Sequence, residues 1–353
     1  MEYQTYFSPD YFTARSRFLS LAQAANCRVE SHPFQQQSPN GEDLTIDVAI
    51  LGSENAKRTI VISSGLHGVE GFLGSAIQLA FLESHFAKEL RTDLSFVLIH
   101  ALNPYGFVHL RRWDEENIDL NRNFLLSGED YKGSPALYPQ LDAFFNPPYP
   151  PSRFEPYWLK AIALILRYGI KALKETLPVG QYDYPKGLFF GGQAHAQTQR
   201  ILELNLSRWI GKAESVCHVD FHTGYGRWGD YILFTGKIDR PEKAGALAVQ
   251  FGSDKLEIWS TEGISYPMNG DLGAWCKAKF PDCDYDFLTA EFGTYPTLKV
   301  VKMLRAENQV FWYAKSEDRN FGEALKEIFA PADRNWRDRT VSQGMDIIQR
   351  AIA

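Results

Sequence analysis

A histidine and a glutamate stand three residues apart in the segment His67–Glu70, which reads HGVE. A neutral imidazole and a carboxylate at this spacing can meet one cation, and the two are ordinary zinc ligands. The segment follows an apolar run at 59–63 and precedes a helical pattern that extends to about residue 86. The position suits a metal because α/β sheets place ligand sites where their strands end. The same spacing also occurs in surface pairs, so the metal interpretation needs further donors.

A second histidine, His222, ends another apolar run, 216–221, and is followed by Thr223 and Gly224. The simpler interpretation is a histidine that is hydrogen-bonded at the end of a strand. The chemical interpretation is a further metal ligand. Asp220 lies two residues earlier and could orient a ligand histidine through its second ring nitrogen.

The segments 111–113 and 117–124 combine arginines and asparagines with apolar residues. An arginine presents a planar fork of donors that matches a carboxylate, so such a cluster suits the anionic end of a substrate. The alternative is a solvated run of charges. That alternative is disfavoured because the charges alternate with Trp, Ile, Leu and Phe.

A single carboxylate, Glu291, lies inside the apolar segment 288–294, which reads LTAEFGT. A charge buried without a partner is costly, so a glutamate inside a strand needs a reason. It is either half of a structural salt bridge or a general base that takes a proton from water beside a metal.

The N-terminal part, about residues 1–50, predicts a helix followed by a hairpin. Residues 8–24 have a helical pattern, with Ser8 as the expected N-cap. Two extended runs, near 27–35 and 43–51, are separated by turn residues and predict a β-hairpin.

The pattern after the hairpin indicates an α/β sheet. Short apolar strands at 59–63 and 94–100 flank a helical segment, which is typical of βαβ units in a sheet covered on both faces. Further strands are expected at 215–221, 230–235 and 286–292, and further helices at 195–211, 240–251, 298–316, 318–329 and 339–352.

Residues 125–192 interrupt this pattern. They hold a loop rich in Pro, Tyr and Phe around 135–157, followed by a helical stretch at about 158–177. Long loops inside compact domains are usually functional. We interpret the segment as an insertion beside the active site, within a single domain over 1–353.

Composition excludes several classes of function. The 353 residues carry a net charge of −6, so there is no basic excess to neutralise nucleic-acid phosphates. The four cysteines form no CxxC pair and match no disulfide framework. The N-terminus lacks the apolar core of a secretory signal, and no run of about 18 apolar residues predicts a membrane span. We therefore expect a cytoplasmic protein without a nucleic-acid or membrane partner, and the oligomeric state stays open.

Taken in order, the four chemical segments resemble the zinc carboxypeptidase superfamily, which includes the aspartoacylase and succinylglutamate desuccinylase branch. The resemblance covers roughly residues 45–315. It implies an α/β fold with a mixed, mainly parallel, eight-stranded twisted sheet flanked by helices, and one zinc ion at the strand ends. By this resemblance His67, Glu70 and His222 are the zinc ligands, and Glu291 is the general base.

The resemblance also implies the residues that bind the substrate. Asn121 and Arg122 match the pair that grips the substrate's terminal carboxylate. Arg112 matches the arginine that polarises the scissile carbonyl, with Arg111 as the alternative. Tyr266 resembles the mobile tyrosine of the carboxypeptidases.

Two departures leave the substrate open. Digestive carboxypeptidases have an arginine where this chain has Val69, and the segment Asp220–Thr223 is closer to the deacylase branch, whereas Tyr266 is closer to the peptidase branch. The substrate is therefore either a small peptide with a free C-terminus or an N-acyl amino acid. A metal-binding relative without activity is the third interpretation.

Overall fold

The computed structural model describes residues 2–84, 92–236, 238, 240–258, 269–314 and 321–353. The described strands form one eight-stranded sheet in the order β1-β2-β4-β3-β5-β8-β6-β7. Their bounds are β1 Arg28–Gln37, β2 Asp43–Gly52, β3 Arg58–Ser64, β4 Leu94–His100, β5 Ser215–Trp228, β6 Tyr231–Thr235, β7 Leu256–Ile258 and β8 Asp284–Gly293.

The centre of the sheet is parallel and its flanks are partly antiparallel. Strands β4, β3, β5 and β8 run parallel to one another. Antiparallel pairing adds β2 and β1 on one side and β6 on the other, and β7 runs parallel to β6. All seven residues of β4 are buried, as expected of a central parallel strand. The structure confirms the predicted mixed, mainly parallel sheet.

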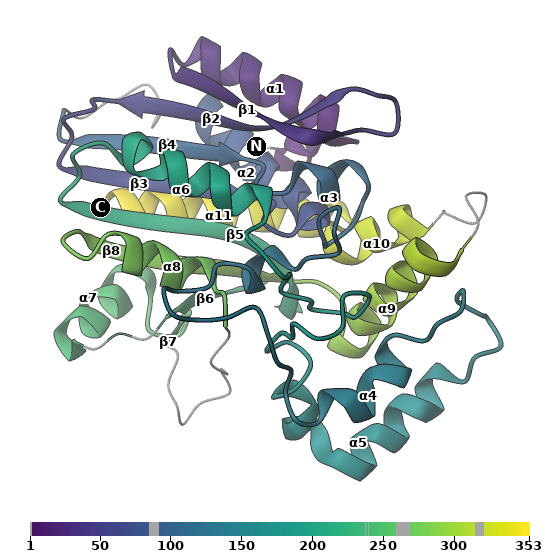
Figure 1. The fold of residues 1–353 in the computed structure, drawn as a ribbon. Helices are drawn as coiled ribbons and strands as arrows, with labels where there is room; N and C mark the ends of the chain where they lie inside the picture. Colours follow the sequence, from purple (N-terminus) through teal and green to yellow (C-terminus); the bar gives the residue numbers. More distant parts are fainter. Residues whose placement is uncertain (1, 85–91, 237, 239, 259–268, 315–320) are drawn as a thin grey trace.

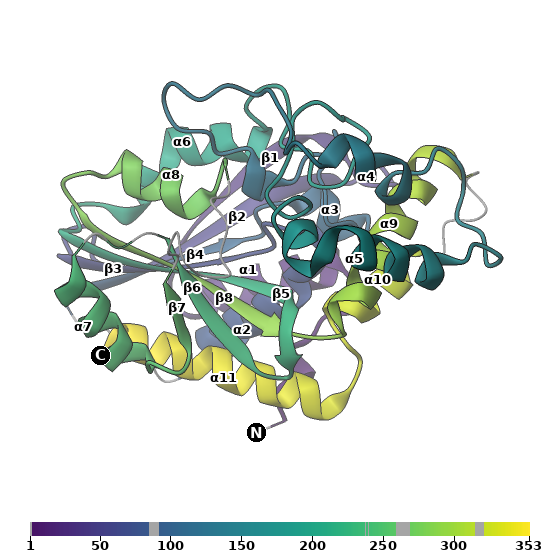
Figure 2. The same cartoon turned by 90° about the horizontal axis from the view of Figure 1, so that it is seen from below.

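Helices cover both faces of this sheet. Figure 2 shows α2 and α11 on one face and α6 and α8 on the other. The α-helices are α1 Tyr11–Ala24, α2 Gly71–Glu83, α3 Pro104–Val108, α4 Tyr138–Phe145, α5 Tyr157–Lys174, α6 Gln197–Ile210, α7 Pro241–Phe251, α8 Leu272–Lys279, α9 Thr297–Tyr313, α10 Phe321–Phe329 and α11 Arg334–Ile352. Within the described residues, the 3-10 helices are η1 Tyr3–Tyr6, η2 Gly68–Glu70 and η3 Leu120–Arg122.

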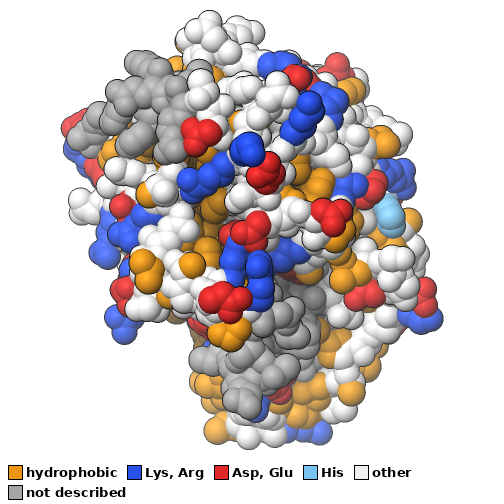
Figure 3. All heavy atoms as spheres, turned by 90° about the vertical axis from the view of Figure 1, so that its left-hand side faces the viewer, with side chains coloured by type: hydrophobic (Ala, Val, Ile, Leu, Met, Phe, Trp, Pro, Cys, Tyr) orange, Lys and Arg blue, Asp and Glu red, His pale blue; other side chains and the backbone are white. Residues whose placement is uncertain are grey.

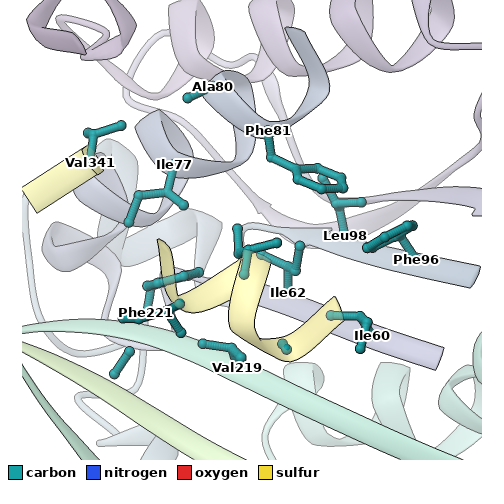
Figure 4. Packing of buried hydrophobic residues seen from close by; sticks show 14 of the residues in the cluster. Ile60, Ile62, Ile77, Ala80, Phe81, Phe96, Leu98, Val219, Phe221 and Val341 are labelled. Atoms are coloured by element: carbon teal, nitrogen blue, oxygen red, sulfur yellow. The ribbon is translucent and has the colours of Figure 1, made fainter. Parts of the chain in front are cut away.

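The apolar core on the α2 side of the sheet explains why α2 and the central strands are rich in apolar residues. Ile62 of β3 and Val219 of β5 belong to the same buried cluster as Ile77 and Phe81 of α2 and Val341 of α11 (Figure 4). Burying such aliphatic and aromatic side chains stabilises the fold by roughly 1.5–3 kcal/mol each. The sheet and α2 therefore form a rigid base for the loops at the strand ends.

The N-terminal helix is present, but it begins later than the sequence suggested. Its N-cap is Asp10, whose Oδ1 accepts a hydrogen bond from the backbone N–H of Thr13 at 2.8 Å. The prediction of Ser8 as the N-cap is therefore wrong. The hairpin of β1 and β2 is also present, with Gly41 at a positive φ of 78° in its turn.

The insertion contains two helices that pack beside α9. Figure 1 shows α4 and α5 next to α9, at the edge of the molecule. Glu155 forms a buried ion pair with Arg305 of α9 at 2.6 Å, and the Tyr157 hydroxyl donates to the Leu298 carbonyl at 3.0 Å. The segment expected to be a loop around 135–157 thus contains α4, which the sequence analysis missed.

The surface offers two further findings. On the face in Figure 3 the coloured acidic and basic side chains are interspersed, without a continuous basic stripe among them. Within the described residues, none of the helices combines the length and the apolar character needed to cross a bilayer.

Candidate active site

The connection between β3 and α2 carries the first two candidate ligands. His67 and Glu70 lie at either end of the single turn η2. The backbone N–H groups of Gly68 and Val69 donate to the carbonyls of Arg112 and Arg111, at 3.2 and 2.8 Å. Residue 68 must be a glycine because a Cβ there would lie 2.1 Å from a backbone carbon. The turn is therefore fixed against the arginine segment.

The sheet register places the third candidate ligand beside the candidate base. His222 of β5 pairs with Glu291 of β8, and Asp220 pairs with Ser63 of β3. Because successive side chains of a strand alternate between faces, Asp220 and His222 project to the same side of the sheet. The parallel pairing brings Glu291 to the ligand histidine.

Three donor atoms converge at this edge of the sheet. His67 Nδ1 lies 3.1 Å from His222 Nδ1 and 3.1 Å from a carboxylate oxygen of Glu70. His222 Nδ1 lies 3.2 Å from the other oxygen of that carboxylate. Donors of a tetrahedral zinc ion with bonds of about 2.1 Å lie roughly 3.4 Å apart. The three buried residues therefore form a group that could hold a metal ion.

Carboxylates contact the second ring nitrogen of both candidate ligand histidines. Asp220 Oδ2 lies 2.6 Å from His222 Nε2, and Asp119 Oδ1 lies 3.0 Å from His67 Nε2. At His222 the carboxylate can accept a hydrogen bond from Nε2–H, which leaves the Nδ1 lone pair for a cation. At His67 the Nη2 of Arg112 also lies 2.8 Å from Nε2, so this nitrogen contacts both a carboxylate and a guanidinium. The orientation expected for Asp220 is thus seen. The orienting role of Asp119 was missed, although the residue belongs to the arginine segment that the sequence had marked.

The buried charges perturb one another. Burial, and then the carboxylate of Glu70, raise the pKa of Glu291 to about 8. Burial opposes ionisation of Glu70, but His67 and then Arg112 outweigh it and lower the pKa of Glu70. Burial, the largest single effect, lowers the pKa of His222, but the carboxylates of Asp220 and Glu70 together raise it well above its ordinary value. The two glutamates thus have pKa values displaced in opposite directions, a pattern common at catalytic sites.

The two neighbouring arginines have different surroundings. The Arg112 guanidinium donates to Glu70 at 2.7 Å and to Asp119 at 3.2 Å, and it lines the site cavity. The Arg111 guanidinium donates to Glu307 at 2.5 Å and lies 3.4 Å from the centre of a phenylalanine ring. Arg111 is buried and is not among the residues that line this cavity.

The candidate carboxylate-binding pair also lines the cavity. Arg122 donates through Nε to the Pro178 carbonyl at 2.9 Å and through Nη1 to the Asn121 carbonyl at 2.5 Å, and Nη2 also bonds Pro178. These bonds use three of the five guanidinium N–H groups, and one on each terminal nitrogen remains. Asn121 Oδ1 accepts from the backbone of Leu272 at 3.0 Å. Tyr266 lies outside the described residues.

A polar chain continues behind His222 that the sequence analysis did not identify. The Ser63 hydroxyl donates to Asp220 at 2.6 Å and lies 2.7 Å from His218 Nε2. The Tyr285 hydroxyl lies 2.9 Å from the other ring nitrogen of His218. Burial lowers the pKa of His218 to about 4, so its imidazole is neutral. The signal in the sequence was the alternation of His218, Asp220 and His222 along one face of an apolar strand.

Comparison with known proteins places the chain in a family. The sequence profile of a family described as "Protein of unknown function (DUF2817)" matches residues 7–343. The chain belongs to this family. A search of curated protein sequences with this chain finds no match.

The fold of this DUF2817 chain is similar to that of metallocarboxypeptidases. Carboxypeptidase A from Helicoverpa armigera is 12% identical, with a TM-score of 0.52 over 92% of this chain and 73% of the other. Bovine thrombin-activatable fibrinolysis inhibitor, solved with a tick carboxypeptidase inhibitor, is 12% identical, with a TM-score of 0.47 over 98% of this chain and 99% of the other. The first similarity shows the zinc carboxypeptidase-like fold, and the second is too weak to add to it.

Proposed function

We propose that this DUF2817 protein is a zinc-dependent hydrolase that cleaves an amide bond next to a free carboxylate, as a carboxypeptidase does. The observation that carries the proposal is the convergence of His67, Glu70 and His222 on one point. Three protein donors leave one position of a tetrahedral ion for solvent or substrate, which is the composition of catalytic rather than structural zinc sites.

The reaction adds one water molecule across the amide and releases a carboxylic acid and an amine. A bound zinc ion would polarise the carbonyl and make water easier to ionise. Glu291 takes a proton from the water molecule as the water oxygen bonds to the carbonyl carbon. It then gives this proton to the amine as the C–N bond breaks. Glu291 suits this role by position, because it pairs in register with His222 and lines the cavity at the ligand set.

The arginines orient the substrate and stabilise the developing charge. Arg112 bonds Glu70 directly, so its guanidinium lies close to any carbonyl oxygen at the ligand set and stabilises negative charge there. Arg122 offers its two remaining N–H groups to the substrate carboxylate, with the Asn121 amide beside it. Fixing the carboxylate in this way holds the amide over the ligand set.

The main alternative is an N-acyl amino acid deacylase of the aspartoacylase and desuccinylase type. The contact between Asp220 and His222 favours it, because the segment Asp220–Thr223 resembles that branch. A metal-binding relative without activity is the second alternative. The position of Glu291 weighs against it, because this carboxyl lines the cavity beside the ligand set without belonging to it, and a site that only stores metal needs no proton acceptor there.

The experiment that tests the proposal compares the free-acid and the C-terminally amidated form of one substrate. The wild type should cleave the free acid much faster, because only that form offers a carboxylate to Arg122. Arg122→Lys keeps the charge but loses the planar fork. A charge-assisted hydrogen bond contributes roughly 1.5–3 kcal/mol, so kcat/KM for the free acid should fall about 10- to 150-fold.

Arg200→Lys is the matched control, because Arg200 is exposed on α6, away from the cavity. It should leave kcat/KM unchanged for both forms of the substrate. Equal cleavage of the free acid and the amide by the wild type would show that no carboxylate anchor exists.

A further inference from the structure

The cavity at the ligand set extends well beyond it. Its volume is about 620 Å³, within the usual range for small-molecule sites. One part of its lining is polar and charged and comprises His67, Arg112, Arg122, His222 and Glu291. The chemistry proposed above uses only this part. About half of the remaining lining comes from α5 of the insertion and from α9, and most of the rest comes from α4, α10, the segment 177–189 and the strands β5 to β8.

The lining from these two helices is predominantly aliphatic. Several turns of α5 present apolar side chains to the cavity, and α9 presents others. Representative members of this apolar wall are Ala161, Leu164, Ile165, Leu173, Val301 and Leu304. Lys174, at the end of α5, is the charged residue that this helix contributes. The Tyr157 hydroxyl in the wall already donates to the carbonyl of Leu298.

The backbone of this wall offers little to an extended peptide. Both sides are helices, and away from the kink of α5 at Gly169 their N–H and C=O groups are bonded within the helix. Proteins that bind extended peptides usually pair the peptide backbone with a sheet edge or supply polar groups for it. A peptide backbone buried against an aliphatic wall would leave amide groups unpaired, which is costly. A hydrocarbon chain has no such groups and gains from burial.

We propose that the substrate is an N-acyl amino acid whose acyl group is a medium-length or long hydrocarbon chain, held between α5 and α9. The inference rests on the proposed hydrolysis of an amide next to a free carboxylate, and it selects the N-acyl amino acid class, named above as the alternative to a peptide. The amino acid carboxylate lies at Arg122, the amide lies at the ligand set, and the chain fills the apolar part of the cavity. Hydrolysis then releases a fatty acid and a free amino acid.

The first test measures kcat/KM for one amino acid carrying acetyl, butanoyl, octanoyl and dodecanoyl groups, together with a peptide of apolar residues that ends in the same amino acid. Burying one methylene should raise kcat/KM by up to about four-fold. We expect a rise over the first members of the series, followed by a plateau when the cavity is full. We also expect slower cleavage of the peptide than of the octanoyl substrate.

The second test places a bulky side chain in the apolar wall, where it would fill the space proposed for the acyl chain. Ala161 is buried on the inner side of α5, whereas Ala163 is exposed on the same helix two residues later. Ala161→Trp should lower kcat/KM for the octanoyl substrate at least about ten-fold and leave the acetyl substrate within about two-fold. The matched control Ala163→Trp should change neither. If Ala161→Trp does not fold, Val301→Trp blocks the cavity from α9 and should show the same selective loss.

The outcomes separate this inference from the proposed function. If the acetyl and octanoyl substrates are cleaved equally well, or the peptide is cleaved best, the hydrocarbon chain is the wrong occupant of the cavity. The proposed hydrolase function would still hold in that case. If no substrate with a free carboxylate is cleaved by the zinc-loaded protein, the proposed function itself fails. Equal loss on all substrates in both Ala161→Trp and Val301→Trp would also overturn the inference, because a blocked chain site must spare the short substrate.

Discussion

The polar part of the cavity, at the ligand set, and its apolar part, at the wall of α5 and α9, differ in how their side chains are held. At the ligand set, each charged side chain is held by others: Asp119 and Asp220 fix the two histidines, and Arg112 bridges Glu70 and Asp119. At the helical wall, α5 has only two buried residues among those described, although most of the helix is apolar. The first part fixes single atoms, as catalysis requires. The second presents a mostly apolar lining, as recognition of a hydrocarbon requires.

The comparison predicts that a change at the ligand set is much more severe than one at the wall. His222→Ala removes one of three donors and leaves the buried Asp220 with the Ser63 hydroxyl but without its imidazole partner. The variant should bind far less than one zinc ion per chain and lose detectable hydrolysis, as measured by metal analysis and the free-acid assay.

His195→Ala is the control for this change, because His195 is exposed and distant from the ligand group. It should keep full metal content and activity. A full complement of zinc in His222→Ala would remove His222 from the ligand set.

The next largest effect separates metal binding from proton transfer. Glu291→Gln should retain the metal, because Glu291 is not part of the ligand group. It should lower kcat at least about 10²-fold, because amide nitrogen cannot accept the proton. Glu214→Gln, at an exposed glutamate, is the control and should have no effect. Near wild-type kcat in Glu291→Gln would assign the base to another group.

The polar chain behind His222 makes stability depend on pH. The imidazole of His218 is neutral in the folded protein because burial lowers its pKa to about 4, against about 6.5 in the unfolded chain. Below pH 6.5 the unfolded chain binds the extra proton, so this stability is present above pH 6.5 and is lost as pH falls toward 4. The loss from this residue should reach about 3 kcal/mol.

Urea unfolding of the metal-free protein at pH 7, 5.5 and 4.5 measures this loss. His218→Gln should show a shallower decline than the wild type, because the variant has no imidazole to protonate. His195→Gln should follow the wild type, since His195 is exposed. An identical decline in His218→Gln and the wild type would assign the pH dependence to other groups.

The sequence predicted the parts of the site that follow from strand ends. The apolar runs before His67 and before His222 indicated parallel strands, and such strands end at one edge of a sheet. It could not choose between Arg111 and Arg112, because neighbours in an irregular segment have no periodicity to tell inside from outside. Their difference depends on Glu307, which lies 196 residues away.

The elements that the sequence missed lack a clear signal of their own. Helix α4 lies in a stretch rich in proline and aromatic residues, where local propensity favours a loop. Its position depends on long-range contacts, such as the bond from Arg305 to the Phe144 carbonyl. Ser8 is a good N-cap by residue type, but Asp10 occupies that position because its carboxylate reaches the N–H of Thr13.

The smallest effect is expected on the outer side of the same helix that forms the wall. Leu166 is 81% exposed on α5, whereas Leu164, two residues earlier, lines the cavity. Leu166→Glu should change the free energy of unfolding by less than about 0.5 kcal/mol and leave kcat/KM unchanged, because no burial is lost. Leu164→Glu should weaken cleavage of the octanoyl substrate at least about ten-fold, because a carboxylate in the wall must be desolvated when the chain binds. Equal effects of the two changes on that substrate would mean that the side of α5 that faces the cavity does not bind the acyl chain. The assignment of α5 as the apolar wall would then be wrong.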